Sequence, residues 1–355
     1  MLIYYTSSFF ITLIIVFIIQ KVAIKLKVVD KPNYRKVHEQ PKALLGGLAV
    51  YLSILLIYSI HLGFSFNNET KYLVILAGIL MLLGLYDDIF DLKAIYKLIG
   101  QLIIAFLTAY FVGGINRIEV YGYVINFTLI QGILIETFWI VALINAFNLI
   151  DGLDGLSSGV GILSLMSLVI LGMINNDSTS IMFIMIMIGS LLGFLYYNFN
   201  PATIFLGDSG SMLIGYLIAI ISMNSYKTVT LTSMMLLMLI AFMPFFDVFL
   251  AIVRRKANKQ KAFEADSLHF HHRLMLKGYS HAKAVFILYF IMTIYSLIAI
   301  FLELTTNFYI KLGLTGFMMI VTIFIFEKLY LLSDKYAYIT KTIKKVTCKK
   351  NKKDM

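Results

Sequence analysis

The sequence predicts an all-α, polytopic integral membrane protein with about eleven transmembrane helices. Hydrophobic residues make up 60% of the 355 residues and charged residues only 14%, whereas a soluble domain keeps about a quarter of its residues charged. The mean hydropathy is +0.88. The apolar runs are continuous and lack the alternation of barrel strands, so helices must satisfy the backbone hydrogen bonds inside the bilayer.

The eleven predicted helices are apolar runs, most of them close to the roughly 17 to 25 residues that a spanning helix needs. In order, they cover residues 2–20, 45–62, 72–85, 98–115, 134–149, 159–174, 181–197, 211–223, 231–253, 284–302 and 309–331. The third and the eighth are short. The first run has neither a basic region before it nor a signal-peptidase site after it, so we expect a retained helix rather than a signal peptide.

Basic residues predict the orientation. Of the 30 Lys and Arg residues, all but Lys71, Arg117, Lys227 and Lys311 fall in or beside the C-terminal tail and the loops after the first, third, fifth, seventh and ninth helices. Positively charged loops stay in the cytoplasm, so we expect the N-terminus outside and the C-terminus in the cytoplasm of a multi-pass protein of the cell (plasma) membrane. The net charge of +11 is then a topology signal.

A single membrane-embedded catalytic domain is expected over residues 1–340, followed by a basic cytoplasmic tail over residues 341–355. The tail is expected to rest on anionic membrane lipid. No soluble domain is large enough to present it to nucleic acid. Cys348 is the single cysteine, so no disulfide forms within the chain.

Five polar clusters lie at the ends of apolar runs, all at the predicted cytoplasmic face. The cluster after the fifth run contains Asn145, Asn148, Asp151 and Asp154. Ionised groups beside a bilayer are costly unless they line a wet cavity or bind a cation or a charged substrate. The other clusters are Arg35 to Gly47, with His38 and Gly46-Gly47; Asp87, Asp88, Asp91, Lys93 and Lys97; Asn198 to Ser211, with Phe205 and Asp208; and Asp247 with Arg254, Arg255, Asp266, His269, His271, His272 and Arg273.

This mixture of residues fits a Mg²⁺-assisted diphosphate site. Carboxylates and carboxamides are hard oxygen ligands that suit Mg²⁺, which commonly bridges protein carboxylates to substrate phosphates. Basic side chains supply charge for phosphate. A helix that starts near Ser209 would point its N–H groups at an anion.

Several structural interpretations stay open beside the functional one. Asp87 and Asp88 could simply end the third helix, although acids there oppose the helix dipole. The Gly46-Gly47 pair could serve helix packing. The His269, His271 and His272 trio could bind Zn²⁺, although no cysteine accompanies it. Arg254 and Arg255 are also expected as ordinary cytoplasmic flanks.

Two motifs carry a resemblance to a known family: Asn145-x-x-Asn148-x-x-Asp151-Gly-x-Asp154-Gly-Leu156, and Phe205-x-Gly207-Asp208-Ser209-Gly210-Ser211. They resemble those of the polyprenyl-phosphate N-acetylhexosamine-1-phosphate transferases, glycosyltransferase family 4. The match runs in order from Arg35 to Arg273. The His-x-His-His form is similar to the UDP-N-acetylglucosamine branch, because the three adjacent histidines of the muramyl-pentapeptide branch are missing. Ala43 departs from the family, which often has a second proline there.

The resemblance implies roles for individual residues. Asn148 and Asp208 would be Mg²⁺ ligands, Phe205 would stack on uracil, and Lys97 would bind the pyrophosphate. The catalytic acids would be Asp87 and Asp88 at the lipid phosphate, Asp154 near the nucleoside, and Asp151. Arg255, His269, His271 and His272 would hold the sugar phosphate.

The implied reaction transfers N-acetylglucosamine 1-phosphate from UDP-N-acetylglucosamine to polyprenyl (undecaprenyl) phosphate and releases UMP. It would start the synthesis of teichoic acid or another cell-surface polysaccharide. Alternative donors are another UDP-N-acetylhexosamine and UDP-MurNAc-pentapeptide. Transfer could be direct or could pass through a phosphorylated aspartate, and the enzyme could be a monomer or a homodimer. A transporter, whose site usually lies near the midplane, and a non-catalytic lipid-binding protein are the alternative classes.

Overall fold

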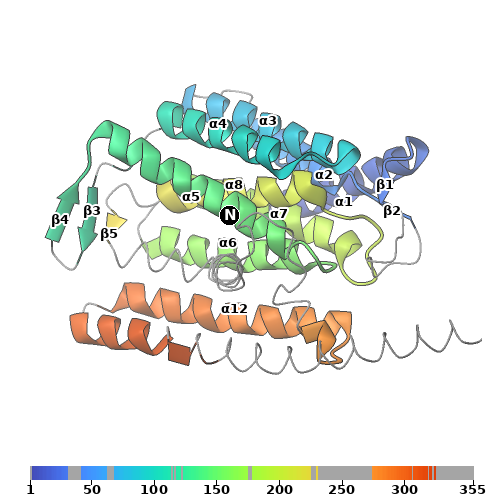
Figure 1. Cartoon of the computed structure of the whole chain (residues 1–355). Helices are drawn as coiled ribbons and strands as arrows, with labels where there is room; N and C mark the ends of the chain where they lie inside the picture. The colour runs from blue at the N-terminus through green and yellow to red at the C-terminus, as the bar shows by residue number, and fades with distance from the viewer. Residues whose placement is uncertain are drawn as a thin grey trace, which may run out of the picture.

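A computed structural model describes most of the chain as a bundle of long helices (Figure 1). The described residues are 2–30, 41–61, 68–112, 115, 117–120, 123–174, 178–224, 229–230, 274–305, 307–318, 320–321 and 324. The helices are α1 (Leu2–Lys25), α2 (Gly46–His61), α3 (Asn68–Phe90), α4 (Ala94–Val112), α5 (Leu129–Ile150), α6 (Leu156–Ile174), α7 (Ser178–Asn198), α8 (Gly207–Asn224) and α12 (His281–Leu304). Residues 308–318 are helical as well.

The helices follow the predicted apolar runs. Each of the first eight runs and the tenth coincides with a helix, and the ninth lies outside the described residues. Among the described residues, seven helices are long and apolar enough to cross a membrane, and α2 and α8 are shorter apolar helices. The chain is therefore a polytopic helical membrane protein. The total of eleven spans and their orientation stay predictions.

The third run was wrongly predicted to be short, because α3 has 23 residues and continues through the acidic pair to Phe90. It ends where Asp91 adopts a left-handed conformation with a φ of 55°, as residues after a helix C-terminus often do. The amide of Asp91 still donates to the carbonyl of Asp87 at 2.9 Å. Asp87 and Asp88 therefore belong to the last turns of α3 and do not open a loop.

Two small sheets lie at opposite ends of the bundle and are minor additions to the predicted all-α fold (Figure 1). At one end, β1 (Val29–Asp30) pairs antiparallel with β2 (Lys42–Ala43). At the other, β3 (Arg117–Val120) pairs antiparallel with β4 (Tyr123–Asn126) and parallel with β5 (Val229–Thr230). These strands are two to four residues long and lie in connections between helices, where no element was predicted from the sequence.

Helix α8 is the centre of the bundle. It packs against α2, α3, α5 and α6, and every residue from Ser209 to Met223 is buried. A helix that is apolar on all sides needs apolar surroundings, either lipid or other elements, and other helices surround α8. Its first turn, which carries Asp208, therefore lies at one end of the core.

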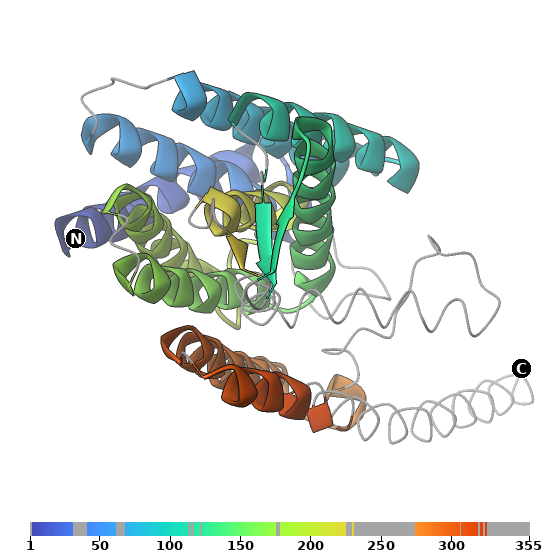
Figure 2. The same ribbon diagram turned by 90° about the vertical axis from the view of Figure 1, so that its left-hand side faces the viewer.

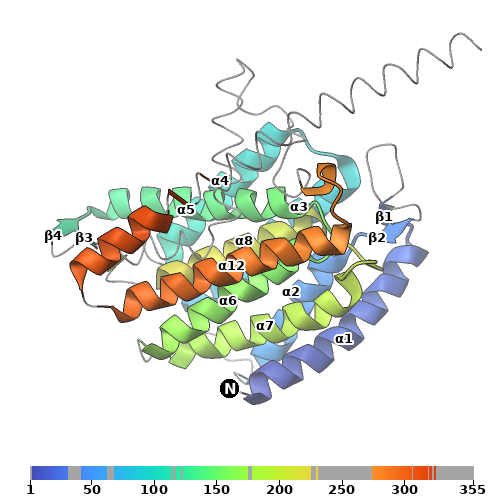
Figure 3. The same cartoon turned by 90° about the horizontal axis from the view of Figure 1, so that it is seen from below.

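The other helices form layers around α8 (Figures 2 and 3). Helix α1 packs on α7 and α2, α4 packs on α3 and α5, and α12 packs on α6. Their outer surfaces carry exposed apolar side chains such as Phe17, Ile79 and Phe106. Because this apolar surface covers spanning helices, it is suited to contact lipid.

Candidate active site

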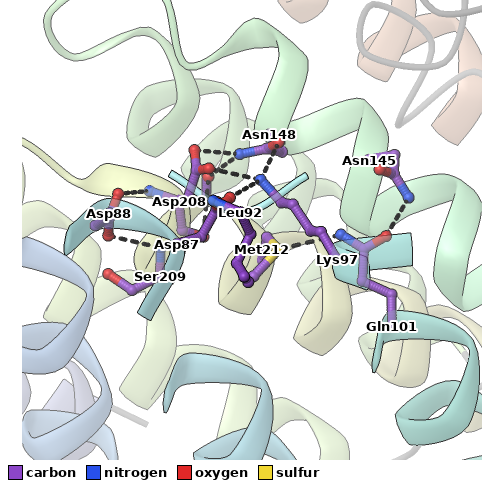
Figure 4. A network of polar contacts seen from close by, with 11 residues as sticks. Asp87, Asp88, Leu92, Lys97, Gln101, Asn145, Asn148, Asp208, Ser209 and Met212 are labelled. Atoms are coloured by element: carbon purple, nitrogen blue, oxygen red, sulfur yellow. Dashed lines mark hydrogen bonds and ion pairs between the residues drawn. The ribbon is translucent and has the colours of Figure 1, made fainter. Parts of the chain in front are cut away.

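Four helix termini meet at one end of the core and bring the polar clusters together (Figure 4). These are the end of α3, the start of α4, the end of α5 and the start of α8. The end of one helix and the start of the next lie at the same end of an antiparallel bundle. This explains how residues up to 121 positions apart in the sequence, Asp88 and Ser209, come into contact.

Lys97 is the hub of the site. Its Nζ atom lies 2.8 Å from Asp87 Oδ2 and 2.5 Å from Asp208 Oδ2, and it donates a hydrogen bond of 3.0 Å to Asn148 Oδ1. The Asn148 amide in turn donates to Asp208 Oδ1 at 2.7 Å and to Ser211 Oγ at 3.1 Å. Three oxygen atoms from three helices thus surround one ammonium group.

Asp88 caps α8 from a neighbouring helix. Its carboxylate accepts hydrogen bonds from the backbone N–H groups of Asp208 at 2.7 Å and Ser209 at 3.2 Å. A Cβ atom on Gly207, whose φ is +73°, would lie 2.6 Å from Asp88 Oδ2, so glycine is needed there for both its conformation and its size. The N–H groups expected to face an anionic substrate therefore bind a carboxylate of the protein itself.

Asp87 is tied into the same end of α3 and α4. Its Oδ1 atom accepts a hydrogen bond of 2.7 Å from the amide of Leu92, while its other oxygen binds Lys97. These two contacts compensate the unfavourable position of an acid at a helix C-terminus. The open alternative that the acidic pair merely ends α3 is therefore too simple, because both carboxylates connect α3 to other elements.

The two aspartates that follow α5, Asp151 and Asp154, differ in their surroundings. Asp154 Oδ2 accepts hydrogen bonds of 3.0 Å from both the Asn200 amide and the Ala202 backbone N–H, so it holds the α7–α8 connection. The Asp154 backbone N–H donates to His281 Nε2 at 2.8 Å. Asp151 lies just after α5, where desolvation and the nearby carboxylates of Asp208, Asp88 and Asp154 raise its pKa well above the ordinary value.

The loop that carries Phe205 is fixed by backbone contacts with the segment before α2. The Phe205 amide donates to the Ala43 carbonyl at 2.8 Å, and the Phe205 carbonyl accepts from the Gly46 amide at 3.1 Å. The Lys42 ammonium group donates to the Ala202 carbonyl. Side chains at Gly46 or Gly47 would collide with Phe205 or Gly210. The glycine pair therefore serves close packing, and Phe205 is placed, partly exposed, at the site end.

Of the predicted site residues, Asp87, Asp88, Lys97, Asn148 and Asp208 form one connected cluster. Asp151, Asp154 and Phe205 lie in the connections beside it. Arg255, His269, His271 and His272 lie outside the described residues, so their roles stay predictions. Sequence reasoning missed Gln101, although a lone amide four residues after Lys97 in an apolar helix was a usable signal.

The donor atoms of the cluster fit Mg²⁺. Asp87, Asp88 and Asp208 against Lys97 give a formal charge of −2, which suits a divalent cation. Within the described part of the chain, no group of three His, Cys, Asp or Glu residues could hold a metal by itself. Mg²⁺ is commonly held by one or two carboxylates, with water and substrate phosphates completing its coordination.

The fold and the site together define a polytopic membrane protein with an acidic, lysine-bridged site at one end of its helical core. A family model described as glycosyl transferase family 4 matches residues 70–226. The chain belongs to this family, as its motifs predicted, and is a transferase.

Several named relatives match most of the chain. A probable undecaprenyl-phosphate N-acetylglucosaminyl 1-phosphate transferase of Bacillus subtilis (strain 168) is 36% identical over 338 residues, which cover 94% of this chain and 93% of that protein. A decaprenyl-phosphate N-acetylglucosaminephosphotransferase of Mycobacterium leprae is 33% identical and covers 75% of this chain and 74% of its own length. The undecaprenyl-phosphate alpha-N-acetylglucosaminyl 1-phosphate transferase of Escherichia coli (strain K12) is 29% identical, with 78% and 77% covered.

Proposed function

We propose that the protein transfers N-acetylglucosamine 1-phosphate from UDP-N-acetylglucosamine to polyprenyl phosphate and releases UMP. The observation that carries this proposal is the cluster in which Lys97 bridges Asp87, Asp208 and Asn148. Such a cluster at the end of a membrane bundle suits two phosphorylated substrates, one dissolved in water and one in lipid. The names of the relatives agree with this substrate pair.

In the proposed reaction, an oxygen of the lipid phosphate attacks the β-phosphorus of the nucleotide sugar. The new P–O bond forms as the bond from that phosphorus to the bridging oxygen breaks, and UMP leaves with the electron pair. A phosphate monoester has a second pKa near ~6, so the acceptor is largely dianionic at neutral pH. Direct attack therefore needs little deprotonation, and Asp87 guides the acceptor or removes a residual proton.

The side chains of the cluster mainly position and neutralise charge, because phosphoryl transfer depends on these two effects. Lys97 is poised to exchange its carboxylate partners for the pyrophosphate oxygens. Asp208 and Asn148 would hold Mg²⁺, which supplies charge stabilisation when bound. Because Lys97 Nζ contacts oxygen atoms of Asp208 and Asn148, Mg²⁺ binding by these two residues would displace the lysine from them.

The remaining roles follow the family motifs. Phe205 stacks on the uracil ring from a loop that backbone hydrogen bonds fix. Asp154 shapes the nucleoside side of the site through the α7–α8 connection. Asp88 supports Asp208 by capping its helix. Arg255 and the three histidines are proposed to bind the sugar phosphate.

The site is proposed to face the cytoplasm, where nucleotide sugars are made. The described clusters from the segments after α1, α3, α5 and α7 lie at the same end of the bundle, because they are joined by hydrogen bonds such as those of Phe205 with Ala43 and of Lys97 with Asn148. These segments belong to the loops that carry the excess of basic residues. The excess supports a cytoplasmic location by the positive-inside rule.

A panel of donors tests the function. Purified protein is incubated with polyprenyl phosphate, Mg²⁺ and UDP-sugars labelled in the sugar, and the label in the lipid phase is counted. We expect UDP-N-acetylglucosamine to be preferred over UDP-N-acetylgalactosamine and UDP-MurNAc-pentapeptide. Preference for another donor would correct the substrate, and no transfer from any donor by folded protein would refute the activity.

A further inference from the structure

A second polar layer lies beneath the site (Figure 4). Gln101 on α4 is fully buried. Its side-chain oxygen accepts a hydrogen bond of 2.8 Å from the amide of Asn145 on α5, and its Nε2 donates to Met212 Sδ on α8 at 3.1 Å. One side chain therefore joins the same three helices that carry the lysine, the carboxamide and the metal-binding aspartate of the proposed site.

This layer repeats the site one helical turn deeper in the bundle. The pairs are Lys97 and Gln101 on α4, Asn148 and Asn145 on α5, and Asp208 and Met212 on α8. Residues three or four positions apart lie on the same face of a helix, one turn or about 5.4 Å apart. Helix α5 runs toward the site and the other two run away from it, so each deeper residue lies under its partner.

The chemistry of Gln101 favours one arrangement of the three helices. A buried amide is costly unless it is hydrogen-bonded, and an apolar side chain could fill the same space without that condition. The hydrogen bond to Asn145 is the stronger contact, because sulfur is a weak acceptor. A rotation or slip of α4 against α5 would break it. Gln101 therefore resists such movements more than an apolar residue would.

We propose that Gln101 is a positioning residue, which with Asn145 fixes α4 so that Lys97 reaches its three oxygen partners. The inference rests on the proposed function. Lys97 Nζ must meet atoms from α3, α5 and α8 at 2.8, 3.0 and 2.5 Å, so a small shift of α4 alters all three contacts. A misplacement of about 1 Å can cost about a hundredfold in rate.

The test compares Gln101→Met with a matched control. Methionine keeps the length of the side chain and removes both amide contacts. We expect kcat to fall at least about tenfold, with the KM for UDP-N-acetylglucosamine changed less than about twofold. The control is Thr108→Val, which removes another α4–α8 contact, the 2.9 Å bond between Thr108 Oγ1 and the Tyr216 hydroxyl. This contact lies about two helical turns deeper in the bundle than Gln101, so Thr108→Val should leave kcat within about twofold.

Asn145→Leu breaks the same hydrogen bond from α5. If the two residues act as one unit, the double variant loses no more rate than the worse single variant. Multiplied losses would overturn the inference. So would a Gln101→Met loss no larger than that of Thr108→Val at equal melting temperature.

A substrate-free measurement separates this inference from the proposed function. Because Gln101 positions Lys97, Lys97→Met should lower the melting temperature less in the Gln101→Met protein than in the wild type. Additive shifts would overturn the positioning role. Wild-type protein that transfers no sugar phosphate would refute the proposed function alone, since the melting experiment uses no substrate.

Discussion

Replacing Asp88 by alanine removes the cap of the central helix. The Asp88 carboxylate accepts the Asp208 and Ser209 amides at 2.7 and 3.2 Å. Loss of an N-cap acceptor costs about 0.5–2 kcal/mol, a hydrogen bond to a charged group contributes about 1.5–3 kcal/mol, and an anion at a helix N-terminus adds up to about 1 kcal/mol. These contributions overlap, and Asp88 is only partly buried, so we expect a loss of about 2–3 kcal/mol.

The assay is the denaturation midpoint of the protein in detergent. Asp88→Asn keeps one oxygen acceptor and should lose about half as much stability as Asp88→Ala. Glu69→Gln is the control, because Glu69 is an exposed acid in the first turn of α3, the helix that also carries Asp88. Equal midpoints for Asp88→Ala and Glu69→Gln would refute the capping account.

Gly207 gives an independent check on the same contact. In Gly207→Ala, the new Cβ atom would meet Asp88 Oδ2 at 2.6 Å. The collision disappears in the Asp88→Ala background, whereas the strain of a positive φ stays. The alanine at position 207 should therefore be less destabilising in that background than in the wild type. Equal costs in both backgrounds would show that the carboxylate does not lie against Gly207.

Further predictions concern the metal, pH, topology and route of transfer. Asp208→Ala should abolish Mg²⁺-dependent UMP release yet insert normally; substantial turnover would remove it from the mechanism. Because the raised pKa of Asp151 favours its protonated form in the folded state, wild-type stability falls as pH rises through that pKa. Asp151→Asn should then raise the unfolding midpoint by a gain that shrinks as the pH is lowered; a pH-independent gain would contradict this. In a Cys348→Ser background, an impermeant maleimide on intact cells should label a cysteine at Asn126 before one at Lys283, and the reverse order would invert the topology. Delipidated enzyme should not exchange labelled UMP into UDP-N-acetylglucosamine; such exchange would indicate a phosphoryl-enzyme.

The sequence predicts the helices and much of the site for one physical reason. In an apolar chain, polar residues at the ends of spanning runs stand out, and antiparallel helices bring alternate ends together. This was enough to place Asp87, Lys97, Asn148 and Asp208 in one cluster. The structure confirms that every apolar run up to α8 forms a helix.

The contacts that the sequence could not reveal depend on tertiary packing. The dipole argument disfavoured a helix that continues through Asp87 and Asp88, yet α3 continues because both carboxylates find donors on other elements. Asp88 is 120 positions from the amide of Asp208, and no local pattern announces a cap from another helix. Gln101 was missed because its importance depends on two partners that come from α5 and α8, although a lone amide in an apolar helix was a usable signal.

The central claim is that the sugar and its phosphate move together onto lipid at this site. The most direct measurement uses UDP-N-acetylglucosamine labelled with ³²P in the β-phosphate and with ¹⁴C in the sugar, together with polyprenyl phosphate and Mg²⁺. We predict that both labels enter the lipid phase in equal amounts, with one UMP released for each lipid formed, and that Asp208→Ala transfers neither label. Transfer of the sugar label alone, with release of labelled UDP, would contradict the account.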